Sequence, residues 1–457
     1  MSGNRVDTAG ASPARTAAMF ALVLVLIVGT GLVQSWNSAL IILNMGLISA
    51  VMALGVNLQW GIAGLFNVGV MGFVALGGLA VVLMGMPPVG ETWAAGGARV
   101  LGGLSVGAAV IVGAVMVWNR GPKRWRGWMT FGLLVVGFVV FRAVYDAGVE
   151  AIESINPAST GYLGGLNFGG SPRTEDGLPL ADLFVLLAWP AGGLLAAGAA
   201  WIIGKTALGL RSDYLAIATL GIAEIVIAVL KNEDWLTRGV KNVTGLPRPV
   251  PYEVTLQQDP GFIERAAGWG TDVTTASTIT VKLGYSLLFA SVLIVLLILA
   301  QLALNSPWGR MMRAIRDNET SARAMGKDVK ARHLQVFILG SAICGIAGAM
   351  MTTLDGQLTP SSYQPLRFTF LVWVMVIVGG SGNNLGAVLG GFVIWFLWVQ
   401  VDPMAQWLVG AVTSGMAEDS ALAAHLTNSA QHLKLLTMGV ILLVVLRFSP
   451  RGLLPER

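Results

Sequence analysis

Many of the side chains that could bind a partner are gathered in one short stretch. Residues 306–333 read SPWGRMMRAIRDNETSARAMGKDVKARH and hold seven of the 29 Lys and Arg residues, together with three acidic residues. The chain as a whole is 55% hydrophobic and only 12% charged. Guanidinium and carboxylate groups concentrated in this way suit recognition of a charged surface, either a lipid headgroup layer or another protein.

Residue patterns for covalent or metal chemistry are missing from the sequence. It contains no G-x-x-x-x-G-K-[ST] phosphate loop and no catalytic triad pattern. The histidines, His333, His425 and His432, have no metal-ligand spacing. We therefore expect no catalytic residue, no metal ligand and no cofactor bound by this chain. If ATP drives the protein, another chain must hydrolyse it.

The charged stretch has the periodicity of an amphipathic helix of about 18 residues. Ser306 and Pro307 form a typical helix start, and Gly326 is placed to end the helix in the left-handed conformation. Asp328 can cap the next helix. Three interpretations fit this pattern: a helix lying on anionic lipid, a solvated loop, or a helix that docks a soluble partner. The expected apolar face holds Met311, Met312, Ile315, Ala322 and Met325.

The elements that must position this stretch are long apolar segments. Mean hydropathy is +0.71, and apolar runs of roughly 20 residues recur, enough to span a hydrocarbon core of about 30 Å. A double segment at 367–400 is interrupted by GGSGNN and predicts two short helices or one re-entrant hairpin. The sequence predicts an all-α polytopic membrane protein with about ten to twelve membrane segments, as one domain over residues 1–457. The other candidate spans are 17–33, 38–58, 64–86, 98–118, 129–145, 181–203, 213–230, 282–304, 333–354 and 431–448.

Basic loops orient these segments, because Lys and Arg collect on the cytoplasmic side. The loop 119–128, the region 306–332 and the C-terminal end are basic and are expected inside. Both termini are therefore expected in the cytoplasm, with 17–33 retained as the first span. The net charge of +5 reflects this loop pattern, so nucleic acid is not an expected partner. The loops expected outside are 146–180, 231–281 and 401–430.

Polar residues inside predicted spans are few, and Glu224 is the clearest ionisable one. A carboxylate at this depth is costly, so it either lines a ligand path or makes a structural bond inside the bundle. Asn57, Gln59 and Asn67 flank or enter the Gly-rich stretch 61–78, and such amides often join helices. The Gly-rich runs 61–78 and 379–391 could instead break helices and expose backbone groups to a substrate. The candidates for a translocation path are Glu224, Asn67, Gly64, Gly69 and Tyr214.

Several stretches together resemble one family. The segment GRMMRAIRDNETSARAMGKDVKARHLQVFILGSAICGIAGAM is similar to a signature of LivM-type permeases of branched-chain amino acid ABC importers. NLQWGIAGLFNVGVMGFVALGGLA, LRSDYLAIATLGIAEIV, VIVGGSGNNLGAVLGG and RFSPRGLL resemble further signatures of that family, in the same order. The region 90–180 departs from the pattern, because family members usually have one span where this chain has three. We interpret it as an insertion of two spans.

The resemblance implies a permease that forms, with a second homologous permease, the path for branched-chain amino acids. It also implies two cytoplasmic ATPases that use ATP and Mg²⁺, an extracytoplasmic substrate-binding protein, and a place among the lipids of the bacterial inner membrane. The charged helix would be the coupling helix, although Arg316 and Glu319 could simply pair with each other. A permease for urea or short amides, a self-contained secondary transporter and a membrane scaffold stay open as alternatives. The implied ATPase contacts are Arg313, Arg316, Asp317, Glu319, Met325 and Gly326.

Overall fold

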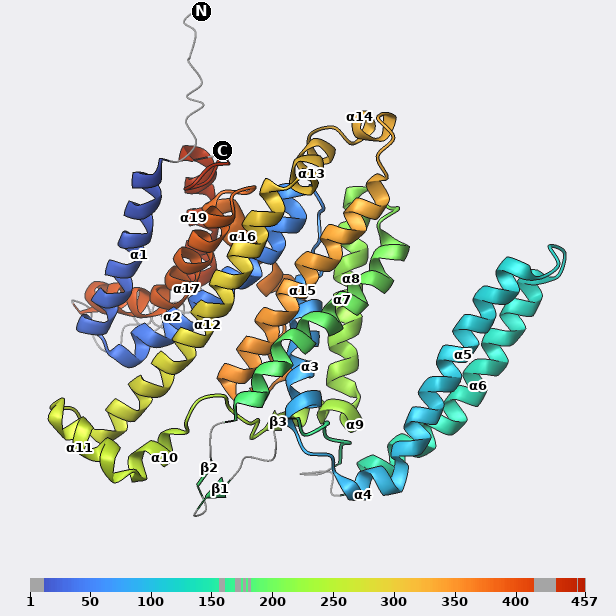
Figure 1. Cartoon of the computed structure of the whole chain (residues 1–457), viewed down its shortest axis with the longest axis horizontal. Coiled ribbons are helices and arrows are strands. Elements are labelled where there is room, and N and C mark those ends of the chain that lie inside the picture. The colour runs from blue at the N-terminus through green and yellow to red at the C-terminus, as the bar shows by residue number, and fades with distance from the viewer. Residues whose placement is uncertain are drawn as a thin grey trace, which may run out of the picture.

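The structure is a computed structural model that describes residues 12–155, 161–168, 174–175, 178–179, 182–414, 433–449 and 451–456. The described chain is almost entirely helical (Figure 1). Up to residue 268 the helices are α1 (Pro13–Val33), α2 (Trp36–Val56), α3 (Val70–Gly85), α4 (Gly90–Thr92), α5 (Ala98–Arg120), α6 (Arg126–Glu153), α7 (Ala188–Ala207), α8 (Ser212–Asn232), α9 (Asp234–Thr237), α10 (Glu253–Gln258) and α11 (Pro260–Gly268).

The later helices include the longest in the described chain. They are α12 (Val273–Asn305), α13 (Pro307–Asp317), α14 (Glu319–Ala324), α15 (Val329–Asp355), α16 (Pro365–Gly379), α17 (Asn384–Thr413) and α19 (Leu433–Phe448). Short π-helical turns occupy Asn57–Ile62 and Trp93–Gly97, and 3-10 turns occupy Leu183–Leu187, Gly239–Lys241 and Pro360–Ser362. Two antiparallel pairs of two-residue strands join β1 (Thr174–Glu175) to β2 (Leu178–Pro179) and β3 (Val243–Thr244) to β4 (Gln357–Leu358).

Nine helical segments within the described residues are long and apolar enough to cross a membrane, which confirms the all-α polytopic prediction. Two further apolar helices, α3 and α16, are shorter. In Figure 1, α13, α14 and the end of α19 lie at one end of the bundle, which we call the α13 end. The short helices α4, α9, α10 and α11 lie at the opposite end, which we call the α11 end. The long helices therefore run between the α13 end and the α11 end.

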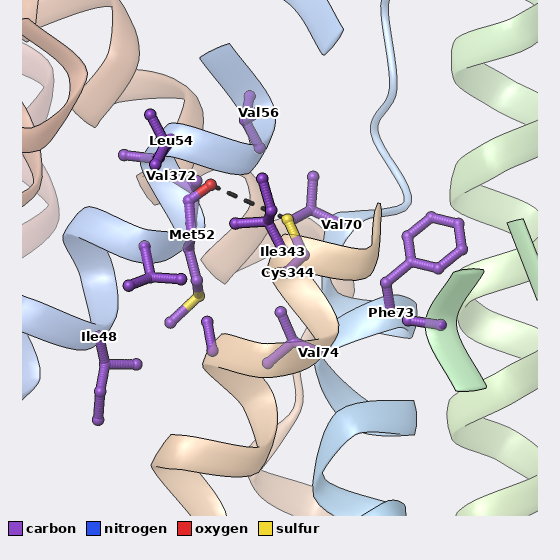
Figure 2. Packing of buried hydrophobic residues seen from close by; sticks show 14 of the residues in the cluster. Ile48, Met52, Leu54, Val56, Val70, Phe73, Val74, Ile343, Cys344 and Val372 are labelled. Atoms are coloured by element: carbon purple, nitrogen blue, oxygen red, sulfur yellow. Dashed lines mark hydrogen bonds between the residues drawn. The ribbon is translucent and has the colours of Figure 1, made fainter. Parts of the chain in front are cut away.

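The core of the bundle is built around α15, which packs against α2, α3 and α7. Figure 2 shows apolar side chains from α2, α3, α15 and α16 meeting in this core, with the Cys344 thiol directed at the carbonyl oxygen of Met52. Glycines allow the close approach: an added Cβ on Gly345 of α15 would lie 2.5 Å from the carbonyl oxygen of Gly192 on α7. Small residues of this kind let membrane helices pack with their backbones near one another.

The helices α5 and α6 form an antiparallel hairpin that stands apart from the main bundle (Figure 1, turquoise). They pack closely on each other, while most of their remaining surface is exposed. The hairpin is anchored near the α11 end by Tyr145, whose hydroxyl donates to Glu233 at 2.6 Å and accepts from the indole N–H of Trp235 at 2.7 Å. The hairpin lies within the region 90–180 that we interpreted as an insertion, and that interpretation stays a prediction.

Several element boundaries differ from the sequence-based predictions, three of them with a clear physical reason or a large extension. The helix α12 begins at Val273, inside the predicted loop 231–281, because the Asp272 side chain caps its first turn. The helix α17 continues to Thr413, through residues that were predicted to begin an outer loop. The expected single helix over 306–326 is two helices, because Asn318 is extended and its side chain caps α14 by accepting from the Ser321 N–H. His425, His432 and residues 415–430 lie outside the described residues.

Candidate functional site

The Gly-rich stretch that follows α2 is a helix break. The predicted span 64–86 is helical only from Val70, and residues 63–69 are non-helical. Gly64 has φ +72°, in the left-handed region that favours glycine. Gly69 lies against α8 so closely that an added Cβ would collide with the Thr219 carbonyl. The Gly-rich run therefore breaks a helix, and the exposure of its backbone groups to a substrate stays a prediction.

Buried amides satisfy the hydrogen bonds of this break. The Gln59 side chain donates to the Phe337 carbonyl at 2.9 Å and to the Ser341 hydroxyl at 3.1 Å, both on α15. Its own carbonyl oxygen accepts from the Asn67 amide at 2.8 Å. Asn67 in turn accepts from the Gly69 N–H at 2.9 Å. We call Gln59 and Asn67, together with the Ser341 hydroxyl that Gln59 contacts, the amide cluster. Its hydrogen bonds join the first break to α15, as the sequence suggested.

A second break, at 380–383, lies beside the first. Gly380 and Gly382 have φ of +120° and +85°, so the chain turns sharply between α16 and α17. The Asn57 side chain accepts from the Gly382 N–H at 2.8 Å and donates to the Asn384 side chain at 3.1 Å. The break between 367 and 400 was predicted, whereas α17 is much longer than the short helix expected there. The two breaks are joined through one asparagine.

Arg316 connects α13 to this pair of breaks. Its Nη1 donates to the Gly61 carbonyl at 2.6 Å and to the Glu456 carboxylate at 2.9 Å, and its Nε donates to Asp317 at 3.2 Å. Burial lowers the Arg316 pKa, but the hydrogen bonds and charges of Glu456 and Asp317 outweigh it and raise that pKa overall. Gly64 leaves room for this side chain, because an added Cβ would lie 3.3 Å from Arg316 Cγ. The Arg316 guanidinium therefore points toward Gly61 and Glu456 of the same chain.

Four of the other residues predicted to contact an ATPase are exposed, namely Asp317, Glu319, Met325 and Gly326. Met325 is 80% exposed, and Gly326, with φ +77°, has open space where a Cβ would lie. Glu319 pairs with Arg323 at 2.5 Å, so the alternative pairing of Glu319 with Arg316 is wrong. The Arg313 side chain turns back and donates to the Leu304 carbonyl at 3.4 Å. Of the expected apolar face, Met312 and Ile315 are buried. The role of the set in ATPase contact stays a prediction.

The five predicted path residues lie in three places. Asn67 and Gly69 are enclosed by the helices around the break. Tyr214, which is 62% exposed, and Glu224 lie on the outward side of α8, and Glu224 has no hydrogen bond or ion pair within the described chain. Gly64 lines a cavity of about 170 Å³ at the α13 end, together with Glu319, Arg323, Lys330 and His333. The structure therefore does not bring Glu224 and Asn67 together.

Sequence reasoning missed three members of the site: Gly61, Asn384 and Glu456. Glu456 follows the terminal RFSPRGLL stretch, which indicated a family signature and a basic cytoplasmic end but no partner for Arg316. Its pairing with Arg316 spans 140 positions, so no local periodicity could have revealed it. Across the described residues there is no group of three or more His, Cys, Asp or Glu side chains that could hold a metal ion.

Comparison with known proteins places this arrangement in a family. The profile described as branched-chain amino acid transport system, permease component, matches residues 127–446. The chain belongs to this family. The matched part of the permease runs from the start of α6 to the end of α19 and includes α13, α14 and the second break. The first break, at 63–69, lies before it.

Several relatives are named as branched-chain amino acid transport permeases. The high-affinity branched-chain amino acid transport system permease protein LivM of Escherichia coli (strain K12) is 25% identical over 273 residues, which cover 58% of the permease and 56% of that protein. A probable LivM of Methanocaldococcus jannaschii is 26% identical over 282 residues, covering 62% and 70%. A probable LivH of that organism is 30% identical over 130 residues, covering 26% and 40%. The permease thus spans a little over half the length of the Escherichia coli relative, and no solved structure matches it.

Proposed function

We propose that this permease is one of two membrane subunits of an ABC importer for branched-chain amino acids. The family and the names of the relatives support leucine, isoleucine, valine or related molecules as substrates. A similarity to both LivM and LivH proteins supports pairing with a second, homologous permease. An extracytoplasmic binding protein delivers the ligand, and the complex lies in the cytoplasmic (inner) membrane. Both termini and the α13 end face the cytoplasm.

The observation that carries the proposal is the surface formed by α13 and α14. The two helices lie across the α13 end (Figure 1). Met312 and Ile315 of α13 are buried, while Asp317, Met325 and Gly326 are exposed. Because the sequence has no phosphate loop, ATP must be bound by separate subunits. Two ATPases dock here, and an exposed methionine with polar neighbours suits insertion into a groove on them.

Met325→Glu tests this docking surface. The substitution places a charge where an apolar contact is expected, so we expect the permease to insert normally and to lose co-purification with the ATPases. Val240→Glu is a matched control, because Val240 is 67% exposed at the opposite end of the bundle. Unchanged recovery of ATPase with Met325→Glu would contradict docking at this surface. Uptake of labelled leucine and urea by the intact complex separates an amino acid importer from one for short amides.

The outward side of α8 is the part of the permease that faces the substrate path. A carboxylate on an exposed helix face in hydrocarbon is too costly to leave unpaired, so Glu224 meets water, a ligand or the second permease. Tyr214 lies on the same side, nearer the α13 end. We expect Glu224→Gln to change the affinity or rate of amino acid uptake. Unchanged uptake kinetics would contradict a role of Glu224 in the substrate path.

A further inference from the structure

The residues at the end of the described chain are built into the α13 end. The Leu453 N–H donates to the Val378 carbonyl at 2.8 Å, and the Leu454 N–H donates to the Gly379 carbonyl at 2.9 Å. The Asn383 side chain donates to the carbonyl of Leu454 at 3.2 Å. Leu454 is completely buried. Residues 451–456, which we call the tail, are therefore fixed to the end of α16 and to the second break.

This anchoring places Glu456 next to Arg316. The two side chains are partly buried, 30% and 24% exposed, and lie 2.9 Å apart. Gly382 makes room for the pair, since an added Cβ would lie 2.7 Å from Glu456 Oε2 and 3.3 Å from Arg316 Nη1. The same Nη1 that meets Glu456 also donates to the Gly61 carbonyl, at the last turn before the first break. Arg316 Nη1 on α13 is therefore bonded both to the tail and to the turn that leads into the first break.

We propose that Glu456 is a positioning residue through which the tail fixes Arg316 of α13 onto the first helix break. A long arginine side chain loses considerable rotamer freedom when it holds one geometry. A carboxylate that is itself fixed by the tail supplies a charge-assisted bond that selects the rotamer reaching Gly61. Arg316 then connects α13 rigidly to residues 61–69, so a movement of α13 would move these residues as well. The expected effect on transport rests on the proposed function, whereas the connection between Glu456, Arg316 and Gly61 does not.

The first test uses hydrogen exchange of the full chain in detergent, without ATPase or substrate. The reporters are the N–H groups of Gly64 and Leu65, which donate to the carbonyls of Trp60 and Gln59. Glu456→Ala should speed their exchange about tenfold, in line with loss of a charge-assisted bond. Glu456→Gln keeps an acceptor oxygen and should give a smaller increase. Unchanged exchange in Glu456→Ala overturns the proposal.

A double-mutant cycle separates positioning from simple packing of the tail. If Glu456 acts through Arg316, Glu456→Ala should add little in an Arg316→Gln background. Additive effects overturn the proposal, because they would mean that the tail stabilises the break independently of Arg316. Arg265→Gln is the control, since Arg265 makes an exposed ion pair with Asp259 at the α11 end and should not affect exchange at Gly64.

The second test measures leucine uptake per ATP hydrolysed in the complete complex. Glu456→Ala should assemble with its partners and lower this ratio several-fold, whereas Arg265→Gln should leave it unchanged. An unchanged ratio in Glu456→Ala, with uptake by the unmodified complex intact, overturns the transport consequence. If the unmodified complex takes up no branched-chain amino acid, the proposed function fails, and the exchange cycle still decides whether Glu456 positions Arg316.

Discussion

Replacing Gly340 by alanine perturbs the crossing of α15 and α2 beside the amide cluster. An added Cβ at this position would lie 2.5 Å from Gln59 Cγ and 2.6 Å from the Gly55 carbonyl oxygen. Ordinary van der Waals contact starts at 3.4 Å, so the two helices must separate by about 0.8 Å. The Gly55 oxygen belongs to the backbone and cannot rotate away. The strain therefore falls on the helix crossing and on Gln59.

The cost follows from two contributions. Overpacking of a close-packed interior costs about 1–3 kcal/mol. Displacing Gln59 weakens its bonds to Phe337 and Ser341, and hydrogen bonds between membrane helices contribute about 0.6 kcal/mol each. Gly340→Ala should therefore lower the free energy of unfolding by about 2–4 kcal/mol. At about 2.1 cal/mol/K of unfolding entropy per residue, a chain of 457 residues loses about 1 °C of Tm per kcal/mol, so the Tm should fall by about 2–4 °C.

Thermal unfolding of the purified permease in detergent, followed by tryptophan fluorescence, measures this difference. Gly198→Ala is the matched control, because Gly198 is an exposed glycine on α7 with no atom within 4 Å of an added Cβ. Its Tm should be unchanged or slightly higher, since alanine is favoured over glycine in a helix by about 0.5–1 kcal/mol. Equal Tm values for the two variants would refute the packing described at Gly340.

Three further predictions concern buried polar groups. Gln59→Leu leaves the Asn67 amide without its acceptor and should lower stability by about 1–3 kcal/mol, measured by the same thermal unfolding. The buried thiol of Cys344 should react with a maleimide only after denaturation, which mass spectrometry of the intact chain detects. Burial raises the pKa of Tyr252, so its stabilising contribution is complete below pH 10 and is lost as pH rises through its raised folded-state pKa. Tyr252→Phe should reduce the alkaline loss of Tm; the same loss in both proteins would contradict this assignment.

Much of the fold could be predicted from the sequence, because each long membrane helix is marked by a local run of apolar residues. It also supports the two helix breaks, since glycine runs beside amides mark places where a helix can be interrupted. The direction of Arg316 could not be predicted, because an amphipathic pattern gives a helix face but not the partner that a long side chain selects. That partner, Glu456, is brought close by the tail through backbone hydrogen bonds, which leave no sequence signal.

The hydrogen bonds of the first break bear on which residues meet a substrate. Asn67 already bonds Gln59 and the Gly69 N–H, so a passing amino acid would have to break the amide cluster to reach it. Glu224 has no such partner within the described chain and lies on the open side of α8. Under the proposed function, Asn67 and Gly69 therefore hold the break together, while Glu224 and Tyr214 face the path. Under the proposed function, the close contact of Gly69 with Thr219 would carry movement of the break to α8. Under the proposed function, α8 therefore faces the substrate, whereas α13 and α14 contact the ATPases.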